Sequence, residues 1–248
     1  MTSEITKKFP YGDLGLISLK SCESLASKID QHLINIRESI SKGNNKYFIN
    51  EIKDTYLLES KNPRFANGEA KFTLEETVRG KDIYIIADIG NYGCTYDLFG
   101  IETNMGPDEH YQDIKRAISA IKGNARRVSV FMPLLYASRQ HKRKGRESLD
   151  CSMALQELEE MGVDNIITFD AHDPRVENAI PSSFENLYPT YEIIESILNT
   201  EGDLEINKDK MMVISPDTGA MDRAIYYAST LELNVGLFYK RRGEGCFF

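Results

Sequence analysis

The sequence has 248 residues, of which 41% are hydrophobic and 27% are charged, and its formal net charge is −8 at pH 7. These proportions predict one large or two modest globular domains, and the negative charge argues against a general nucleic-acid-binding protein. Because there is no apolar run near 18 residues and no signal-peptide pattern over residues 1–20, we expect neither a membrane span nor a secretory signal. Four scattered cysteines without metal-type or redox-type spacing favour a reducing compartment, so we expect a cytoplasmic protein.

The first 60 residues contain one predicted strand and one predicted helix. Residues 14–18 are typical of a strand, and residues 24–40 place Leu25, Ile29, Leu33 and Ile36 along one helical stripe. From about residue 80 the alternation of apolar runs with amphipathic segments becomes regular. We expect strands at 83–87, 128–135, 166–169, 211–214 and 235–239, and helices at 111–121, 148–161, 191–198 and 221–231.

Two of these helices have a clear apolar face and clear ends. The first carries Ile114, Ala117, Ile118 and Ile121 on one face and is closed by Gly123. The second, for which Ser148 is the expected N-cap, carries Cys151, Leu155, Leu158 and Met161 on one face.

Strand–helix alternation with short links predicts an α/β fold, in which helices cover both faces of a parallel sheet. The charged segment 201–210 either links two sheets or lies in a loop. Ligands of such folds gather outside the carboxyl ends of the strands. Four polar clusters of this sequence follow predicted strands, and we expect them to meet at one sheet edge.

Two of the four clusters carry carboxylates. In the turn 169–173, Asp170 and His172 are close enough in sequence to reach one divalent cation, although such a pair also commonly satisfies loop backbone groups. In the segment 213–220, a strand leads through Asp217 into a helix N-terminus that suits phosphate. Asp217 could hold magnesium there, or it could be an ordinary N-cap.

The other two clusters are cationic. The run 139–146 is almost entirely basic, and Lys240, Arg241 and Arg242 follow the last predicted strand. A concentrated positive patch on an acidic protein indicates a discrete anionic ligand, with a solvated turn or a solubilising terminus as the alternatives. Cations, a magnesium-type site and a helix N-terminus together favour a nucleotide or a sugar phosphate.

The order of six landmarks resembles the ribose-phosphate pyrophosphokinase family, also called phosphoribosyl pyrophosphate synthetases. The landmarks are residues 64–69 with 76–80, 136–140 with its basic tail, 169–172, 186–188, 215–217 and 239–242. The resemblance covers roughly residues 60–242 and implies a parallel-sheet, phosphoribosyltransferase-like α/β fold. It implies a complete N-terminal domain over 1–190 and an incomplete second domain over 191–248, so that the chain looks C-terminally shortened.

The resemblance also implies a reaction, in which the diphosphoryl group of MgATP passes to ribose 5-phosphate and AMP is released. By matching motif, adenine would be held by Phe65, Asn67 and Glu69, in the family from across a subunit interface. The rest of the nucleotide would contact Arg139, Gln140, Lys142 and Arg143. Mg²⁺ would be held by His172 with Asp170, and a second Mg²⁺ by Asp217, while Lys240 and Arg242 would act in catalysis.

The implied partners are ATP, ribose 5-phosphate and further copies of the chain, as a homo-oligomer from dimer to hexamer. The sequence departs from the family at His141, where many members carry Asp, and at Pro181, where many carry an acidic residue. After residue 242 it lacks the acidic pair and the Thr-Gly-Gly-Thr-like loop that hold the sugar phosphate. An alternative is therefore a non-catalytic nucleotide-binding or regulatory subunit of such a synthetase.

Overall fold

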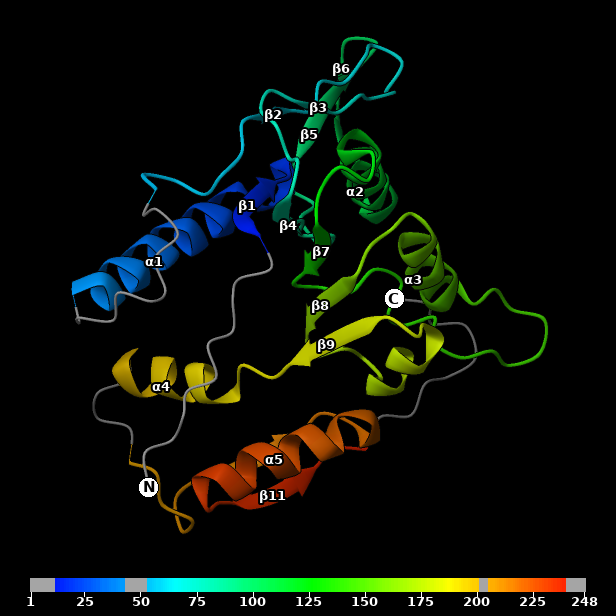
Figure 1. Cartoon of the computed structure of the whole chain (residues 1–248). Coiled ribbons are helices and arrows are strands. Elements are labelled where there is room, and N and C mark those ends of the chain that lie inside the picture. The colour runs from blue at the N-terminus through cyan, green and yellow to red at the C-terminus, as the bar shows by residue number, and fades with distance from the viewer. Residues whose placement is uncertain (1–11, 43–52, 201–204, 240–248) are drawn as a thin grey trace. The chain divides into compact units, whose positions relative to one another are not determined.

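The protein, seen as a computed structural model, is described over residues 12–42, 53–200 and 205–239 (Figure 1). It divides into two compact units, Met1–Tyr188 and Pro189–Phe248. The division falls two residues before the boundary expected from the sequence. In the described part of the chain, no helix is long and apolar enough to cross a membrane.

The first unit is organised around one five-stranded sheet. Its strands, in spatial order, are β1 (Asp13–Ser18), β4 (Lys81–Ile86), β7 (Arg127–Met132), β8 (Asn165–Phe169) and β9 (Ser183–Leu187). Every neighbouring pair is parallel. All five carboxyl ends therefore lie at the same edge, which confirms the expected α/β class for this unit.

Helices cover both faces of this sheet (Figure 1). On one face, α2 (Pro107–Ile121) and α3 (Asp150–Glu160) pack against the buried side chains of β4, β7 and β8. The apolar face predicted for residues 111–121 is confirmed, since Ile114, Ala117, Ile118 and Ile121 are all buried. On α3, Cys151, Leu155 and Leu158 are buried as predicted, and Met161 is half-buried at the C-cap.

On the other face, a short 3₁₀ turn, η1 (Lys20–Cys22), leads into α1 (Glu23–Lys42), which packs over β1 and β4. The buried carboxylate of Asp30 fixes this helix, because it accepts hydrogen bonds from Thr55 Oγ1 and Tyr56 N, both at 2.7 Å. The bonded segment runs beside β1, where the Leu58 amide donates to Leu16 O at 2.8 Å. The outer edge of β1 is thus paired rather than open.

Two small antiparallel ribbons project from the first unit. The strands β2 (Ser60–Lys61) and β3 (Thr73–Leu74) enclose residues 64–70, and β5 (Thr95–Leu98) pairs with β6 (Ile101–Asn104). Figure 1 shows both ribbons beyond α2, away from β9. The sequence did not predict them, because each strand is too short to show a period.

The second unit contains α4 (Thr190–Thr200), β10 (Met212–Ser215), the 3₁₀ turn η3 (Thr218–Ala220), α5 (Met221–Leu231) and β11 (Asn234–Leu237). The strands β10 and β11 pair in parallel as a two-stranded sheet of their own. The expectation that all four polar clusters share one sheet edge is therefore wrong. Two clusters follow β7 and β8, and the other two follow β10 and β11.

The predicted elements from residue 80 onward are otherwise present within a few residues of their expected bounds. Two strands are shorter than predicted, since β7 ends at Met132 and β11 at Leu237. The predicted cap is also wrong, because α3 begins at Asp150 with Leu149 as N-cap. The Ser148 hydroxyl instead donates to Asp150 Oδ2 at 3.1 Å, and Gln140 binds the Ser148 carbonyl at 2.8 Å.

Candidate functional site

The turns after β7 and β8 meet at the carboxyl edge of the five-stranded sheet. His141, in the loop after β7, places Nε2 3.2 Å from Asp173 Oδ2, in the turn after β8. The His141 and His172 rings also meet edge to face, with centroids 5.2 Å apart. Two of the four sequence clusters are therefore adjacent in space, as parallel neighbours predict.

Asp173 is the electrostatic centre of this junction. Its carboxylate accepts hydrogen bonds from Arg175 N at 3.0 Å and from Arg175 Nε at 2.9 Å. These bonds, with smaller contributions from the charges of Arg175 and His141, hold the Asp173 pKa well below its usual range, although burial opposes the shift. The carboxylate is thus ionised at neutral pH and engaged with its own neighbours.

The turn that presents Asp170 and His172 is held from β9. The Asp170 amide donates to Leu187 O at 2.9 Å, and the Ala171 amide donates to Asn186 Oδ1 at 2.8 Å. Asp170 has a φ of 51°, which an Asp tolerates better than most residues. His172 is exposed, so its imidazole faces solvent at the sheet edge.

The basic loop after β7 is closed at its base by Gln140. Its amide nitrogen donates to Ser148 O at 2.8 Å, and its backbone amide donates to Ala137 O at 2.8 Å. Between these anchors, Arg139, Lys142 and Arg143 are exposed. The three predicted nucleotide-binding cations therefore lie on a loop that contacts His172 through His141, and Gln140 forms a hydrogen bond within that loop.

Tyr136 fixes the start of the same loop to helix α2. Its hydroxyl donates to Asp108 Oδ1 at 2.7 Å, and its ring stacks on Tyr111 with centroids 4.3 Å apart. Burial, followed by the hydrogen bond to Asp108, raises the Tyr136 pKa to about 12. The hydroxyl therefore stays protonated and keeps donating across the neutral range.

The predicted adenine-binding residues lie elsewhere in the unit, on the hairpin 64–70. Phe65 N donates to Glu69 O at 2.7 Å, and Gly68 N donates to Phe65 O at 2.9 Å. Gly68 has a φ of +85°, and a Cβ there would lie 3.2 Å from Leu98 Cδ1, so the turn requires glycine. Phe65, Asn67 and Glu69 are all exposed, and the ring of Phe65 is 50% accessible.

This hairpin contacts the β5–β6 ribbon and helix α2. The Phe99 amide donates to Ala66 O at 2.8 Å, and Arg64 Nη2 lies 2.7 Å from Asp113 Oδ2. Within one chain, the described contacts of the hairpin thus run to the β5–β6 ribbon and α2, whereas His172 and Asp173 contact His141 of the basic loop.

Asp217 lies in the second unit, as the N-cap of η3. Its Oδ1 accepts from Gly219 N at 3.0 Å and from Ala220 N at 3.2 Å. Of the two alternatives that the sequence offered for Asp217, the structure shows the N-cap. The predicted catalytic residues Lys240 and Arg242 lie outside the described residues.

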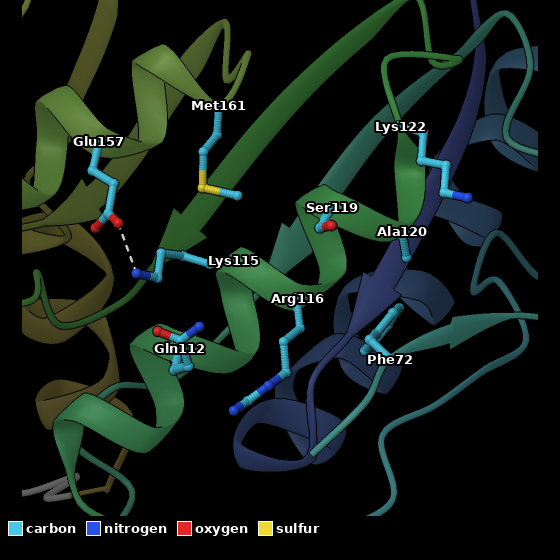
Figure 2. Close-up of a pocket in the computed structure, with 9 residues that line it drawn as sticks. All are labelled: Phe72, Gln112, Lys115, Arg116, Ser119, Ala120, Lys122, Glu157 and Met161. Carbon is cyan, nitrogen blue, oxygen red and sulfur yellow. Dashed lines mark hydrogen bonds and ion pairs between the residues drawn. The ribbon is translucent and has the colours of Figure 1, made fainter. Parts of the chain in front are cut away.

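A cavity of about 540 Å³ among the described residues lies away from these turns. It lies between α2 and α3 and is lined by Lys115, Arg116, Lys122 and Glu157 among others (Figure 2). Lys115 pairs with Glu157 at 2.7 Å, and Arg116 pairs with Asp113 at 2.6 Å. In Figure 2, Arg116 and Lys122 point away from each other, so the cavity is not a phosphate cradle.

Sequence reasoning underrated three residues that support the site. His141 was noted only as a departure from the family, Asp173 only as the end of the 169–173 cluster, and Asn186 only as part of the 186–188 landmark. Each is a polar residue in or directly beside a landmark segment. Their contacts join segments far apart in the chain, which periodicity does not reveal.

Comparison with known proteins identifies the family. A family model described as the N-terminal domain of ribose phosphate pyrophosphokinase matches residues 14–162, which is more than half of the chain. The chain belongs to the ribose-phosphate pyrophosphokinase family.

Individual members of the family are distant in sequence. A ribose-phosphate pyrophosphokinase of Oceanobacillus iheyensis is 25% identical over 241 residues, covering 96% of this chain and 63% of the relative. Ribose-phosphate pyrophosphokinase 3 of Saccharomyces cerevisiae is 30% identical over 190 residues, covering 76% of this chain and 54% of the relative. The chain therefore spans less than two thirds of the length of these relatives.

The fold has a solved counterpart in the same family. The crystal structure of phosphoribosylpyrophosphate synthetase from Mycobacterium smegmatis matches with a TM-score of 0.71 at 20% identity. The match covers 93% of this chain and 65% of that chain. At this identity the likeness concerns the fold, and it agrees with the mainly parallel α/β architecture.

Proposed function

We propose that the chain acts as a ribose-phosphate diphosphokinase, which transfers the diphosphoryl group of MgATP to ribose 5-phosphate. The observation that carries the proposal is the junction of the turns after β7 and β8. There the family's basic loop and its His172 turn are joined through the 3.2 Å contact between His141 and Asp173. Because the chain spans only part of its relatives, the activity is proposed for the protein to which this chain contributes these sites.

The triphosphate is proposed to bind beside the basic loop. Arg139, Lys142 and Arg143 are exposed cations on one loop, and guanidinium groups bind phosphate in a bidentate manner. Gln140 is given a supporting role here, since its amide closes the loop on Ser148. The resemblance also implied that Gln140 contacts the nucleotide directly. We propose that the hydrogen-bonding groups of its side chain that do not bind Ser148 make this contact.

Adenine is proposed to bind on the hairpin 64–70. The half-exposed ring of Phe65 suits stacking on the base, and Asn67 and Glu69 offer an amide and a carboxylate for its hydrogen-bonding edge. The described contacts of this hairpin run to β5, β6 and α2, which supports the family arrangement in which it serves the site of another copy. We therefore expect a homo-oligomer, from dimer to hexamer.

Mg²⁺ is the proposed cofactor, and it neutralises phosphate charge when bound with ATP. Among the described residues no group of three or more His, Cys, Asp or Glu is arranged to hold a metal ion. The chemistry of the donors nevertheless fits Mg²⁺, which commonly keeps its waters and uses one or two protein groups plus substrate phosphates. Asp170 and His172 would be those groups, and Asp217 would be the group for a second ion.

The transfer step moves the terminal two phosphoryl groups together. The C1 hydroxyl oxygen of ribose 5-phosphate bonds to the β-phosphorus and its proton passes to solvent, while the bond from that phosphorus to the α–β bridging oxygen breaks and AMP leaves. Lys240 and Arg242 are proposed to stabilise the charge on the transferring group, as cations placed near a phosphoryl transfer do.

The reaction products test the proposal. The protein is incubated with ribose 5-phosphate and MgATP, and ³¹P NMR follows the phosphorus species. We expect AMP and a 1-diphosphorylated sugar phosphate to form in equal amounts, and we expect His172→Ala to slow both at least about 100-fold. The exposed Lys71→Ala variant is the control. Formation of ADP, or unchanged turnover in His172→Ala, would contradict the proposal.

A further inference from the structure

A buried carboxylate in the middle of helix α2 is held between two guanidinium groups. The side chain of Asp113 is only 4% exposed. Its Oδ2 lies 2.7 Å from Arg64 Nη2, and its Oδ1 lies 2.6 Å from Arg116 Nη1. Each carboxylate oxygen is therefore hydrogen-bonded to one guanidinium group, and the two bonds together fix the orientation of the carboxylate.

Arg64 links the buried Asp113 carboxylate to the hairpin 64–70. Its side chain is 11% exposed, its backbone pairs with Ala70 across the hairpin, and Nη1 donates to Gly68 O at 3.3 Å. The guanidinium also lies over the ring of Tyr96, 5.2 Å from the centroid. The Arg64 side chain thus contacts the turn of the hairpin, strand β5 and helix α2, while its backbone pairs across the base of the hairpin.

Few other hydrogen bonds hold the rest of the hairpin in the described part of the chain. Over the residues that the structure describes, its backbone hydrogen bonds are those of Phe65 with Glu69 and Gly68, that of Lys71 with Pro63 O at 3.2 Å, and that of Phe99 with Ala66 O. The three residues proposed to bind adenine are exposed, so packing does not set their direction. A small exposed turn of this kind opens easily unless a buried contact anchors it.

We propose that Asp113 is a positioning residue, which holds the hairpin through Arg64 and thereby sets the selectivity for the nucleotide base. Arg116 supports it by pairing with the second carboxylate oxygen of Asp113 at 2.6 Å. The inference has two halves. The selectivity half, that Asp113 influences the choice of base, rests on the proposed function of the hairpin. The holding half, that Asp113 holds the hairpin in place, rests only on the contacts above.

Hydrogen exchange tests the holding half without any ligand. The full chain and its Asp113→Asn variant are compared by mass spectrometry over peptides covering residues 64–70. We expect exchange of these amides to rise about ten-fold in Asp113→Asn, because losing the charge frees Arg64. The matched control is Asp82→Asn, which removes the carboxylate of another part-buried pair, with Arg127 at 2.6 Å, and should leave the hairpin unchanged.

Base selectivity tests the other half. The ratio of the dissociation constants for MgGTP and MgATP is measured in both proteins, with inorganic tripolyphosphate as a probe that has no base. We expect Asp113→Asn to reduce the ratio about ten-fold and to change tripolyphosphate affinity less than about two-fold.

Two results would overturn the inference. One is hairpin exchange that is equal in wild type and variant, or that rises uniformly over the whole chain. The other is an opened hairpin with an unchanged ratio. A wild-type protein that does not prefer ATP would contradict the proposed function of the hairpin and the selectivity half, whereas the exchange result would still decide whether Asp113 holds the hairpin.

Discussion

His141 Nε2 lies 3.2 Å from Asp173 Oδ2, and this contact joins the basic loop after β7 to the turn after β8. The two residues are far apart in the chain and are brought together because β7 and β8 are parallel neighbours. Asp173 also accepts a hydrogen bond from Arg175 Nε, which fixes the carboxylate in place. Through His141, Asp173 therefore anchors one side of the loop that is proposed to bind triphosphate.

Asp173→Asn should destabilise the protein in a pH-dependent way. The Asp173 pKa is below its usual value, so the carboxylate stabilises the fold fully above the usual pKa of about 4 and loses this contribution as pH falls below that value. Arg175 is largely exposed, which limits the free energy of unfolding at stake to about 1–2 kcal/mol at pH 7.

Urea unfolding of both proteins between pH 7 and pH 3 measures this effect. The difference between wild type and variant should shrink toward the acid end. A difference that is constant with pH would show that the ionised carboxylate is not what stabilises the turn.

Tyr136→Phe has the opposite pH signature. The Tyr136 pKa is raised to about 12, so its hydroxyl stabilises the fold fully below the usual value near 10 and loses the effect as pH rises toward 12. We expect the variant to lose about 1 kcal/mol of unfolding free energy at pH 8, from the bond to Asp108, while the ring still stacks on Tyr111.

Thermal or urea unfolding at pH 8 and pH 10.5 gives the comparison. Tyr188→Phe serves as the hydroxyl control, because Tyr188 is exposed and its hydroxyl accepts a hydrogen bond from Asn186 Nδ2 at 2.7 Å. Equal losses in the two variants would contradict the role given to the Tyr136–Asp108 bond.

The interface between α2 and the sheet can be tested with two identical substitutions. Ile114 is 0% exposed, whereas Ile36 on α1 is 40% exposed. We expect Ile114→Ala to cost about 3 kcal/mol of unfolding free energy and Ile36→Ala to cost less than about 1 kcal/mol. Similar costs in urea unfolding would mean that the described packing of α2 is incorrect.

Phe65→Ala should weaken MgATP binding about ten-fold, since stacking on a base contributes about 1–3 kcal/mol. Affinity for tripolyphosphate should not change, because the ring is proposed to contact only the base. The control is Phe99→Ala, which removes another exposed ring, 73% accessible, from the neighbouring ribbon. Isothermal titration calorimetry that finds equal losses for the two variants would remove Phe65 from the adenine site.

Much of the fold follows from local pattern. Most of the buried apolar residues of α2 and α3 were predicted, because a helix on a sheet needs apolar residues three and four apart, whereas the buried Asp113 of α2 was not. Strand β9 was missed because Ser183–Leu187 is largely polar and lies at the sheet edge, where the apolar requirement is weak. The cap of α3 was misplaced because the Ser148 hydroxyl bonds the Asp150 side chain and not a backbone amide of the helix.

The site was predictable as a set of segments but not as a set of contacts. The carboxyl-end rule correctly joined the 139–146 and 169–173 clusters, and it failed for Asp217 because β10 and β11 form a separate sheet. The pairs Arg64–Asp113 and His141–Asp173 connect side chains whose spacing in sequence carries no signal. Such contacts are set by the tertiary fold.

A double-mutant cycle on MgATP affinity tests the central claim most directly, that the turns after β7 and β8 form one triphosphate site. Dissociation constants are measured by calorimetry for wild type, Arg139→Ala, His172→Ala and the double variant. The account predicts that both single variants bind MgATP more weakly and that their effects are coupled by at least about 1 kcal/mol. Strictly additive effects, or unchanged affinity in either single variant, would contradict it.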